Sequence, residues 1–107
     1  MQEELSTYIA GPMTGRKDHN FPAFRLAAQQ LREAGWIVVN PAEGAWNKKR
    51  DRPWEFYMAH DISRMVHCDS LHVLPGYKKS KGARLEIQIA KRLKKSIYKL
   101  ATGERIA

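Results

Sequence analysis

Residues 70–100 decide the fold, and they read SLHVLPGYKKSKGARLEIQIAKRLKKSIYKL. Residues 70–74 form a short apolar run that the Pro-Gly pair at 75–76 ends, which is typical of a buried strand. Residues 80–95 follow with helical spacing of apolar positions, and residues 96–100 form another short apolar run. A strand, a helix and a strand in this order predict a right-handed crossover between two parallel strands.

The same alternation extends toward the start of the chain. Residues 6–10 and 36–39 are predicted to be strands, and residues 21–34 a helix capped by Asn20. Another helix is expected from about Pro53. Its apolar stripe is expected to consist of Met58, Ile62, Met65 and Val66. The final residues, 101–107, resemble a tail.

These elements predict an α/β fold. We expect a single-domain Rossmann-like or flavodoxin-like three-layer sandwich over residues 1–107, with a mostly parallel sheet of about four to five strands and helices on both faces. In such folds a ligand binds beyond the carboxyl ends of the strands. The loops expected at that edge are residues 11–19, 40–52 and 75–79. The site is therefore expected where these loops meet the start of the helix over 80–95.

Composition sets further bounds. The chain has 107 residues and a net charge of +8, which makes an anionic partner plausible: a nucleotide, a nucleic acid or an acidic protein. No apolar run approaches the roughly 18 residues of a membrane span, and the first residues lack a signal-peptide pattern. Cys68 is the one cysteine, which favours a reducing compartment and a cytoplasmic location, the host cytoplasm if the chain is phage-encoded. No Cys/His spacing indicates a metal site.

Glu86 is the most informative residue. It falls on the apolar side of its predicted helix, with Ala83, Ile87 and Ala90 as neighbours at helical spacing. Burial of a carboxylate there costs several kcal/mol unless another group stabilises it. A carboxylate near a helix start, behind a loop with Ser and Gly, indicates a nucleophile or a base. The alternative is a helix residue that turns outward to pair with a cation.

Several short motifs together resemble a known family. They are YIAGP at 8–12, DI at 61–62, CD at 68–69 and SKGA at 80–83, followed by Glu86. In this order and at these strand ends they resemble the nucleoside 2-deoxyribosyltransferase superfamily, over residues 8–100. That superfamily contains transferases, 2′-deoxynucleoside 5′-monophosphate N-glycosidases and small members common in phage and bacterial genomes. The chain is most similar to the small members.

The resemblance implies roles for the acidic centre. Glu86 would attack the anomeric carbon of deoxyribose and form a covalent glycosyl-enzyme. Tyr8 would orient that nucleophile or contact the sugar, unless it is a core aromatic with a satisfied hydroxyl. Asp61 would contact the base and help to protonate it, or bind a sugar hydroxyl, unless it is a solvated helix residue.

The resemblance also implies a substrate-binding rim. It consists of Gly11, Pro12, Met13, Thr14, Gly15, Arg16, Trp46, Ser80 and Gly82. Family transferases acting on free nucleosides carry an Asp where this chain has Ser80, and an Asp would repel a phosphate. Ser80, with the helix start and the neighbouring lysines, therefore favours a 5′-monophosphate, although it also suits a simple cap. The monophosphate glycosidases have an Arg at the position of Thr14, and Arg16 is a candidate substitute. Trp46 would stack on a base or anchor its loop.

Three functions follow as hypotheses. The first is cleavage of an N-glycosidic bond, or deoxyribosyl transfer, on a nucleoside 5′-monophosphate, with hydrolase and transferase both open. The second is a nucleotide-binding module without turnover, and the third is a basic nucleic-acid-binding protein, which rests on charge alone. The chemistry requires no cofactor and no metal. Family members are oligomers, so a homodimer or a larger homo-oligomer is expected, and no membrane partner.

Overall fold

A computed structural model describes residues 4–44 and 51–107. Within these residues the chain folds into a four-stranded sheet in the order β2-β1-β3-β4, and all three pairings are parallel. The strands are β1 (Ser6–Ala10), β2 (Ile37–Val39), β3 (Ser70–Val73) and β4 (Ser96–Lys99). The predicted α/β class with a parallel sheet is confirmed.

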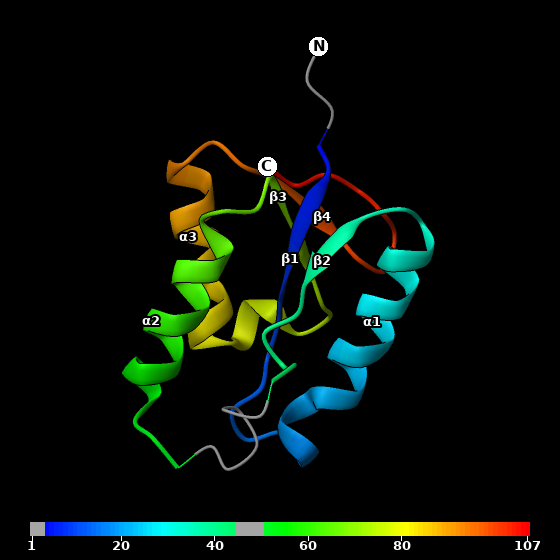
Figure 1. Cartoon of the computed structure of the whole chain (residues 1–107). Coiled ribbons are helices and arrows are strands. Elements are labelled where there is room, and N and C mark those ends of the chain that lie inside the picture. Colours follow the sequence, from blue (N-terminus) through cyan, green and yellow to red (C-terminus); the bar gives the residue numbers. More distant parts are fainter. Residues whose placement is uncertain (1–3, 45–50) are drawn as a thin grey trace.

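Helices cover both faces of the sheet (Figure 1). Helix α1 (Phe21–Glu33) lies on one face, and α2 (Trp54–Met65) and α3 (Lys81–Arg92) lie on the other. Short 3₁₀ turns, η1 (Lys17–Asn20) and η3 (Tyr77–Lys79), precede α1 and α3. The three-layer arrangement is therefore as expected, with boundaries shifted by a few residues at most.

Strand β1 lies between the two halves of the core. Because successive strand residues point to opposite faces, Ile9 packs with Phe24 and Leu31 of α1, while Tyr8 and Ala10 face the other helices. The side chains of Tyr8, Ile9 and Ala10 are all fully buried. This central strand carries Tyr8 to the carboxyl edge of the sheet, beneath α2 and α3.

The start of α1 differs from the prediction in its chemistry. Asn20 stands at the N-cap, but its backbone is left-handed with φ of 61° and its side chain accepts no helix N–H. Its Nδ2 instead donates to the carbonyl of Pro12 at 3.0 Å. Pro22, in the first turn, offers no N–H to a capping oxygen. Asn20 thus ties the first loop to α1.

The buried side of helix α2 differs from the predicted apolar stripe. Met58 and Met65 are buried as expected, but Ile62 and Val66 are only half-buried. Tyr57 and Asp61 are buried in their place. The apolar pattern missed this because α2 faces a polar pocket as well as the core, so a tyrosine and an aspartate occupy its inner side.

The prediction that residues 101–107 form a tail is wrong. This segment turns back and runs antiparallel to β4, with a bridge between Tyr98 and Arg105. The backbone N–H of Ile106 donates to Ile97 at 2.7 Å, and that of Ile97 donates to Ala107 at 3.0 Å. The segment satisfies backbone groups that an uncovered edge strand would leave unpaired.

Candidate functional site

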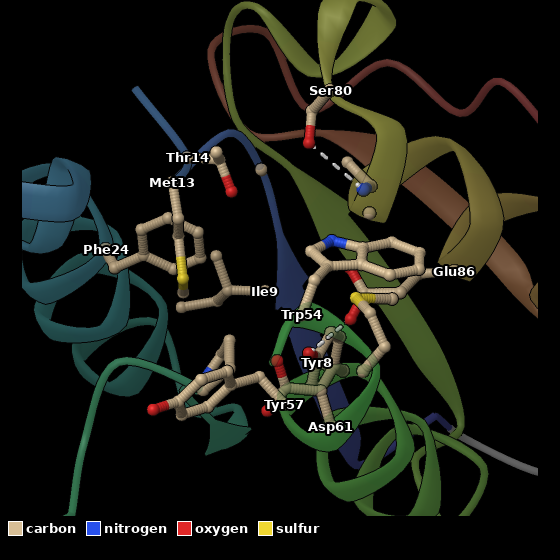
Figure 2. A pocket seen from close by; sticks show the side chains of 15 residues that line it. Tyr8, Ile9, Met13, Thr14, Phe24, Trp54, Tyr57, Asp61, Ser80 and Glu86 are labelled. Atoms are coloured by element: carbon tan, nitrogen blue, oxygen red, sulfur yellow. Dashed lines mark hydrogen bonds between the residues drawn. The ribbon is translucent and has the colours of Figure 1, made fainter. Parts of the chain in front are cut away.

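A pocket opens at the carboxyl edge of the sheet, where the predicted loops meet the start of α3 (Figure 2). Its space amounts to about 410 Å³ when the open solvent at its mouth is included. The residues that line it come from β1, the first loop, α1, the loop after β2, α2, and α3 with its N-cap. They are Tyr8, Ile9, Gly11, Met13, Thr14, Phe24, Pro41, Trp54, Tyr57, Met58, Asp61, Ser80, Gly82, Ala83 and Glu86.

Glu86 lies deep in this pocket. Ser80 begins α3 by accepting a hydrogen bond from the backbone N–H of Ala83 at 3.1 Å. From that start, helical spacing turns Glu86 inward together with Ala83, Ile87 and Ala90, and all four are buried. Glu86 is only 5% exposed. The expectation that its carboxylate faces inward is confirmed, and the outward-turned alternative is wrong.

Tyr8 is the hydrogen-bond partner of Glu86. Its hydroxyl donates to Oε2 of Glu86 at 2.5 Å, across 78 residues of sequence (Figure 2). Tyr8 itself is fully buried. A buried hydroxyl that donates to a carboxylate favours the ionised carboxylate and fixes the direction in which its oxygens point.

Asp61 adds a second acidic side chain. It lies on the inner side of α2, lines the same pocket and is 6% exposed, so it is not the solvated helix residue of the alternative interpretation. Its charge contributes to raising the pKa of both Glu86 and Tyr8. The sequence-predicted trio of Glu86, Tyr8 and Asp61 therefore shares one pocket.

Electrostatics make Glu86 an unusual carboxyl group. Burial raises its pKa from 4.5 to about 8; the hydroxyl of Tyr8 opposes the rise and the charge of Asp61 adds to it. Burial, followed by the charges of Glu86 and Asp61, raises the pKa of Tyr8 well above its ordinary value. A pKa of about 8 favours the protonated form of Glu86 at neutral pH. A pKa displaced this far in a pocket is typical of groups that handle protons or attack substrates.

The first loop forms one wall. Gly11, Met13 and Thr14 line the pocket. A Cβ on Gly11 would lie 2.8 Å from Cβ of Leu74, so only glycine lets β1 pass this close to the end of β3. Gly15 lies in the turn beyond, with φ of 77°, and lines neither this pocket nor the cleft described next.

A second cavity, which we call the outer cleft, continues from the mouth of the pocket. It is lined by Pro12, Thr14, Arg16, Trp54, Lys79, Ser80, Lys81 and Gly82. Ser80 and Gly82 belong to both cavities, whereas Arg16 and Pro12 reach only the cleft. Apart from Gly15, the described residues of the sequence-predicted rim are thus divided between the pocket and the outer cleft. Trp46 lies outside the described residues.

Trp54 and Tyr57 are pocket residues that the sequence analysis missed. Trp54 opens α2 and lines both cavities, and Nζ of Lys81 lies 4.0 Å from the centre of its ring. Tyr57 is buried, and its hydroxyl accepts a hydrogen bond from the backbone N–H of Arg52 at 2.9 Å. They stand seven and four residues before Asp61 and so share its side of α2, but spacing places them in the pocket only once Asp61 is known to face it.

Two further findings concern metal ligands and membrane helices within residues 4–44 and 51–107. No group of three or more His, Cys, Asp or Glu side chains there could hold a metal ion. No helix in the same ranges is long and apolar enough to cross a bilayer.

The pocket and sheet define an α/β domain with a buried carboxyl group at the carboxyl edge of its strands. Comparison with known families matches residues 5–99 to DUF4406, a domain of unknown function. Because this match covers most of the chain, the protein belongs to the DUF4406 family. None of the curated proteins matches the sequence.

Proposed function

We propose that this protein cleaves the N-glycosidic bond of a nucleoside 5′-monophosphate, or transfers its deoxyribosyl group, through a covalent intermediate on Glu86. The observation that carries the proposal is the buried pair of Glu86 and Tyr8, at 2.5 Å, in a pocket that also holds Asp61. The motif resemblance to nucleoside 2-deoxyribosyltransferases supplies the reaction type.

The proposed first step forms a bond between a carboxylate oxygen of Glu86 and C1′ of the sugar. The C1′–N bond breaks as this bond forms, and its electron pair leaves with the base, which takes up a proton from Asp61 or from solvent. Tyr8 holds the attacking carboxylate in place through its hydrogen bond. Where solvent supplies that proton, ionised Asp61 stabilises the positive charge that develops on the sugar.

The second step releases the sugar. The oxygen of a water molecule bonds to C1′, the bond to Glu86 breaks, and the proton of the water passes to Asp61 or to solvent, whichever protonated the base in the first step. Replacement of the water by an acceptor base would make the enzyme a transferase. Both outcomes use the same carboxylate, so product analysis with and without added free base distinguishes them.

The phosphate end is assigned to the mouth of the pocket. Ser80 stands at the N-terminus of α3 and lines the mouth. Helix N-termini carry a partial positive charge and favour anions, and the described residues of the adjoining cleft include Arg16, Lys79 and Lys81. An Asp in place of Ser80 would add a negative charge there, so Ser80→Asp should shift preference from monophosphates to free nucleosides by tenfold or more.

The decisive experiment is a base-release screen over ribo- and deoxynucleoside monophosphates. Wild-type protein should release base from at least one of them, and Glu86→Gln should abolish release. Glu55→Gln, an exposed substitution on α2, is the matched control. Absence of base release with every nucleotide would reject the proposal, and thermal stabilisation by a nucleotide without release would indicate a binding module.

The pH profile tests the role of Glu86. A nucleophile must be ionised, and the pKa of Glu86 is about 8. For the free enzyme, kcat/KM should therefore rise with pH and level off above about 8. If Glu86 served as a general acid, the profile would fall over the same range.

An assembly of several copies belongs to the same proposal. We expect a homodimer or larger homo-oligomer, in which a neighbouring copy helps to close the mouth of the pocket. Sedimentation at micromolar concentration checks the expectation, and a monomer that retains full base release would contradict it.

A further inference from the structure

The pocket around Glu86 does not end at the proposed phosphate position. Thr14, Trp54, Ser80 and Gly82 line both the pocket and the outer cleft. The two cavities therefore adjoin each other at these four residues. A ligand with its sugar at Glu86 and its 5′ end at Ser80 has room to continue into the cleft.

The outer cleft is cationic. Of the described residues that line it, Arg16, Lys79 and Lys81 are basic and none is acidic. Within residues 4–44 and 51–107, neither Arg16 nor Lys79 forms an ion pair with a carboxylate. Asp18 lines a neighbouring hollow with Arg16 but makes no ion pair with it in the described part of the chain. These charges are available to a ligand.

Two of the cations are held in place by contacts that do not neutralise them. A Cβ on Gly76 would lie 2.7 Å from Nη2 of Arg16, so the guanidinium rests against the glycine backbone. Gly76 has φ of 87°, which a larger residue would adopt only with strain. Lys81 rests over the ring of Trp54 at 4.0 Å, where a cation–π contact orients it and preserves its charge.

A single phosphate does not match this charge. Ser80 and the N-terminus of α3 already offer a hydroxyl and a partial charge of about +0.5 to one phosphate group. Each phosphate added in a chain brings further negative charge and extends outward, in the direction of the cleft. A polyphosphate therefore satisfies cations that a monophosphate leaves without a partner.

We propose that the outer cleft binds the β- and γ-phosphates of a nucleoside 5′-polyphosphate, so that the di- and triphosphates are better ligands than the monophosphate. Ser80 contacts the first phosphate, and Arg16, Lys79 and Lys81 contact those beyond it. This inference rests on the proposed function for the placement of the sugar at Glu86. It extends that function from one phosphate to a substrate class.

The test compares the mono- and triphosphate of one deoxynucleoside at fixed ionic strength, without divalent cations. Glu86→Gln protein permits affinity to be measured by calorimetry in the absence of turnover. The triphosphate should bind at least tenfold more tightly. Arg16→Gln and Lys79→Gln, each added to Glu86→Gln, should reduce this preference several-fold. Arg84→Gln, an exposed substitution on α3 outside both cavities, is the matched control and should preserve it.

Equal affinity for the two nucleotides would overturn the inference, as would variants that weaken both nucleotides equally. Tighter binding of a 5′-phosphorylated oligonucleotide than of the triphosphate would also overturn it, because the cleft would then hold a strand. If wild-type protein releases base from a monophosphate and shows no preference for the triphosphate, the proposed function is supported and the polyphosphate inference is rejected. Arg16-dependent triphosphate binding without base release by wild-type protein supports the cleft and rejects the catalysis.

Discussion

Replacement of Glu86 by Gln should stabilise the fold increasingly as the pH rises. Glutamine has nearly the same shape and its carbonyl oxygen can still accept the hydrogen bond from Tyr8, but it does not ionise. Glu86, in contrast, ionises as the pH rises. Burial disfavours its charged form and raises its pKa to about 8, so ionisation of Glu86 costs stability. The variant thus removes the cost of holding a carboxyl group in the pocket.

The direction in which the stability of the wild-type protein changes with pH follows from proton binding to Glu86. The pKa of Glu86 is about 8 in the folded chain and 4.5 as an ordinary exposed carboxyl, so the folded state binds more protons between these values. The contribution of Glu86 to stability is complete below about 4.5 and is lost as the pH rises through about 8. At about 1.4 kcal/mol per pH unit, the loss across this window is on the order of 5 kcal/mol, and about 4 kcal/mol of it falls between pH 5 and pH 9.

Urea unfolding at pH 5, 7 and 9 measures the effect. The difference in unfolding free energy between Glu86→Gln and wild type should grow by about 4 kcal/mol over this range. Glu55→Gln provides the control, since this side chain is exposed on α2 and its substitution should give a nearly constant difference. A constant difference for Glu86→Gln as well would refute the argument that burial displaces the pKa of this carboxyl group.

Three further predictions concern other parts of the fold. Tyr8→Phe removes the hydrogen bond to Glu86 and should lower kcat/KM for base release by about 10- to 100-fold, because bonds to charged groups contribute roughly 1.5–3 kcal/mol. Gly11→Ala would bring its Cβ to 2.8 Å from Cβ of Leu74 and should lower stability by about 1–3 kcal/mol in urea titration, whereas Gly82→Ala, whose neighbour is the flexible side chain of Met58, should cost less. Deletion of residues 101–107 uncovers the β4 edge and should lower the midpoint of thermal unfolding and increase aggregation in light scattering; an unchanged midpoint would show that this segment does not support the sheet.

Local sequence was sufficient for the order of elements and for the inward face of α3. Short apolar runs separated by helical patterns encode strands and helices within a few residues, and the right-handed crossover then leads to a parallel sheet. Glu86 could be placed because its neighbours at helical spacing, Ala83, Ile87 and Ala90, are apolar. Ser80 could be placed as the cap because a hydroxyl just before a helix is a local signal.

Tertiary structure alone decided which side chains meet. Tyr8 reaches Glu86 across 78 residues, and no local pattern encodes such a contact. Trp54 and Tyr57 enter the pocket because α2 packs with its polar side toward the carboxyl edge of the sheet, a rotation that its apolar residues do not specify. The return of residues 101–107 along β4 likewise depends on backbone groups of a distant strand. Periodicity records which face of an element is buried, whereas packing determines what lies against that face.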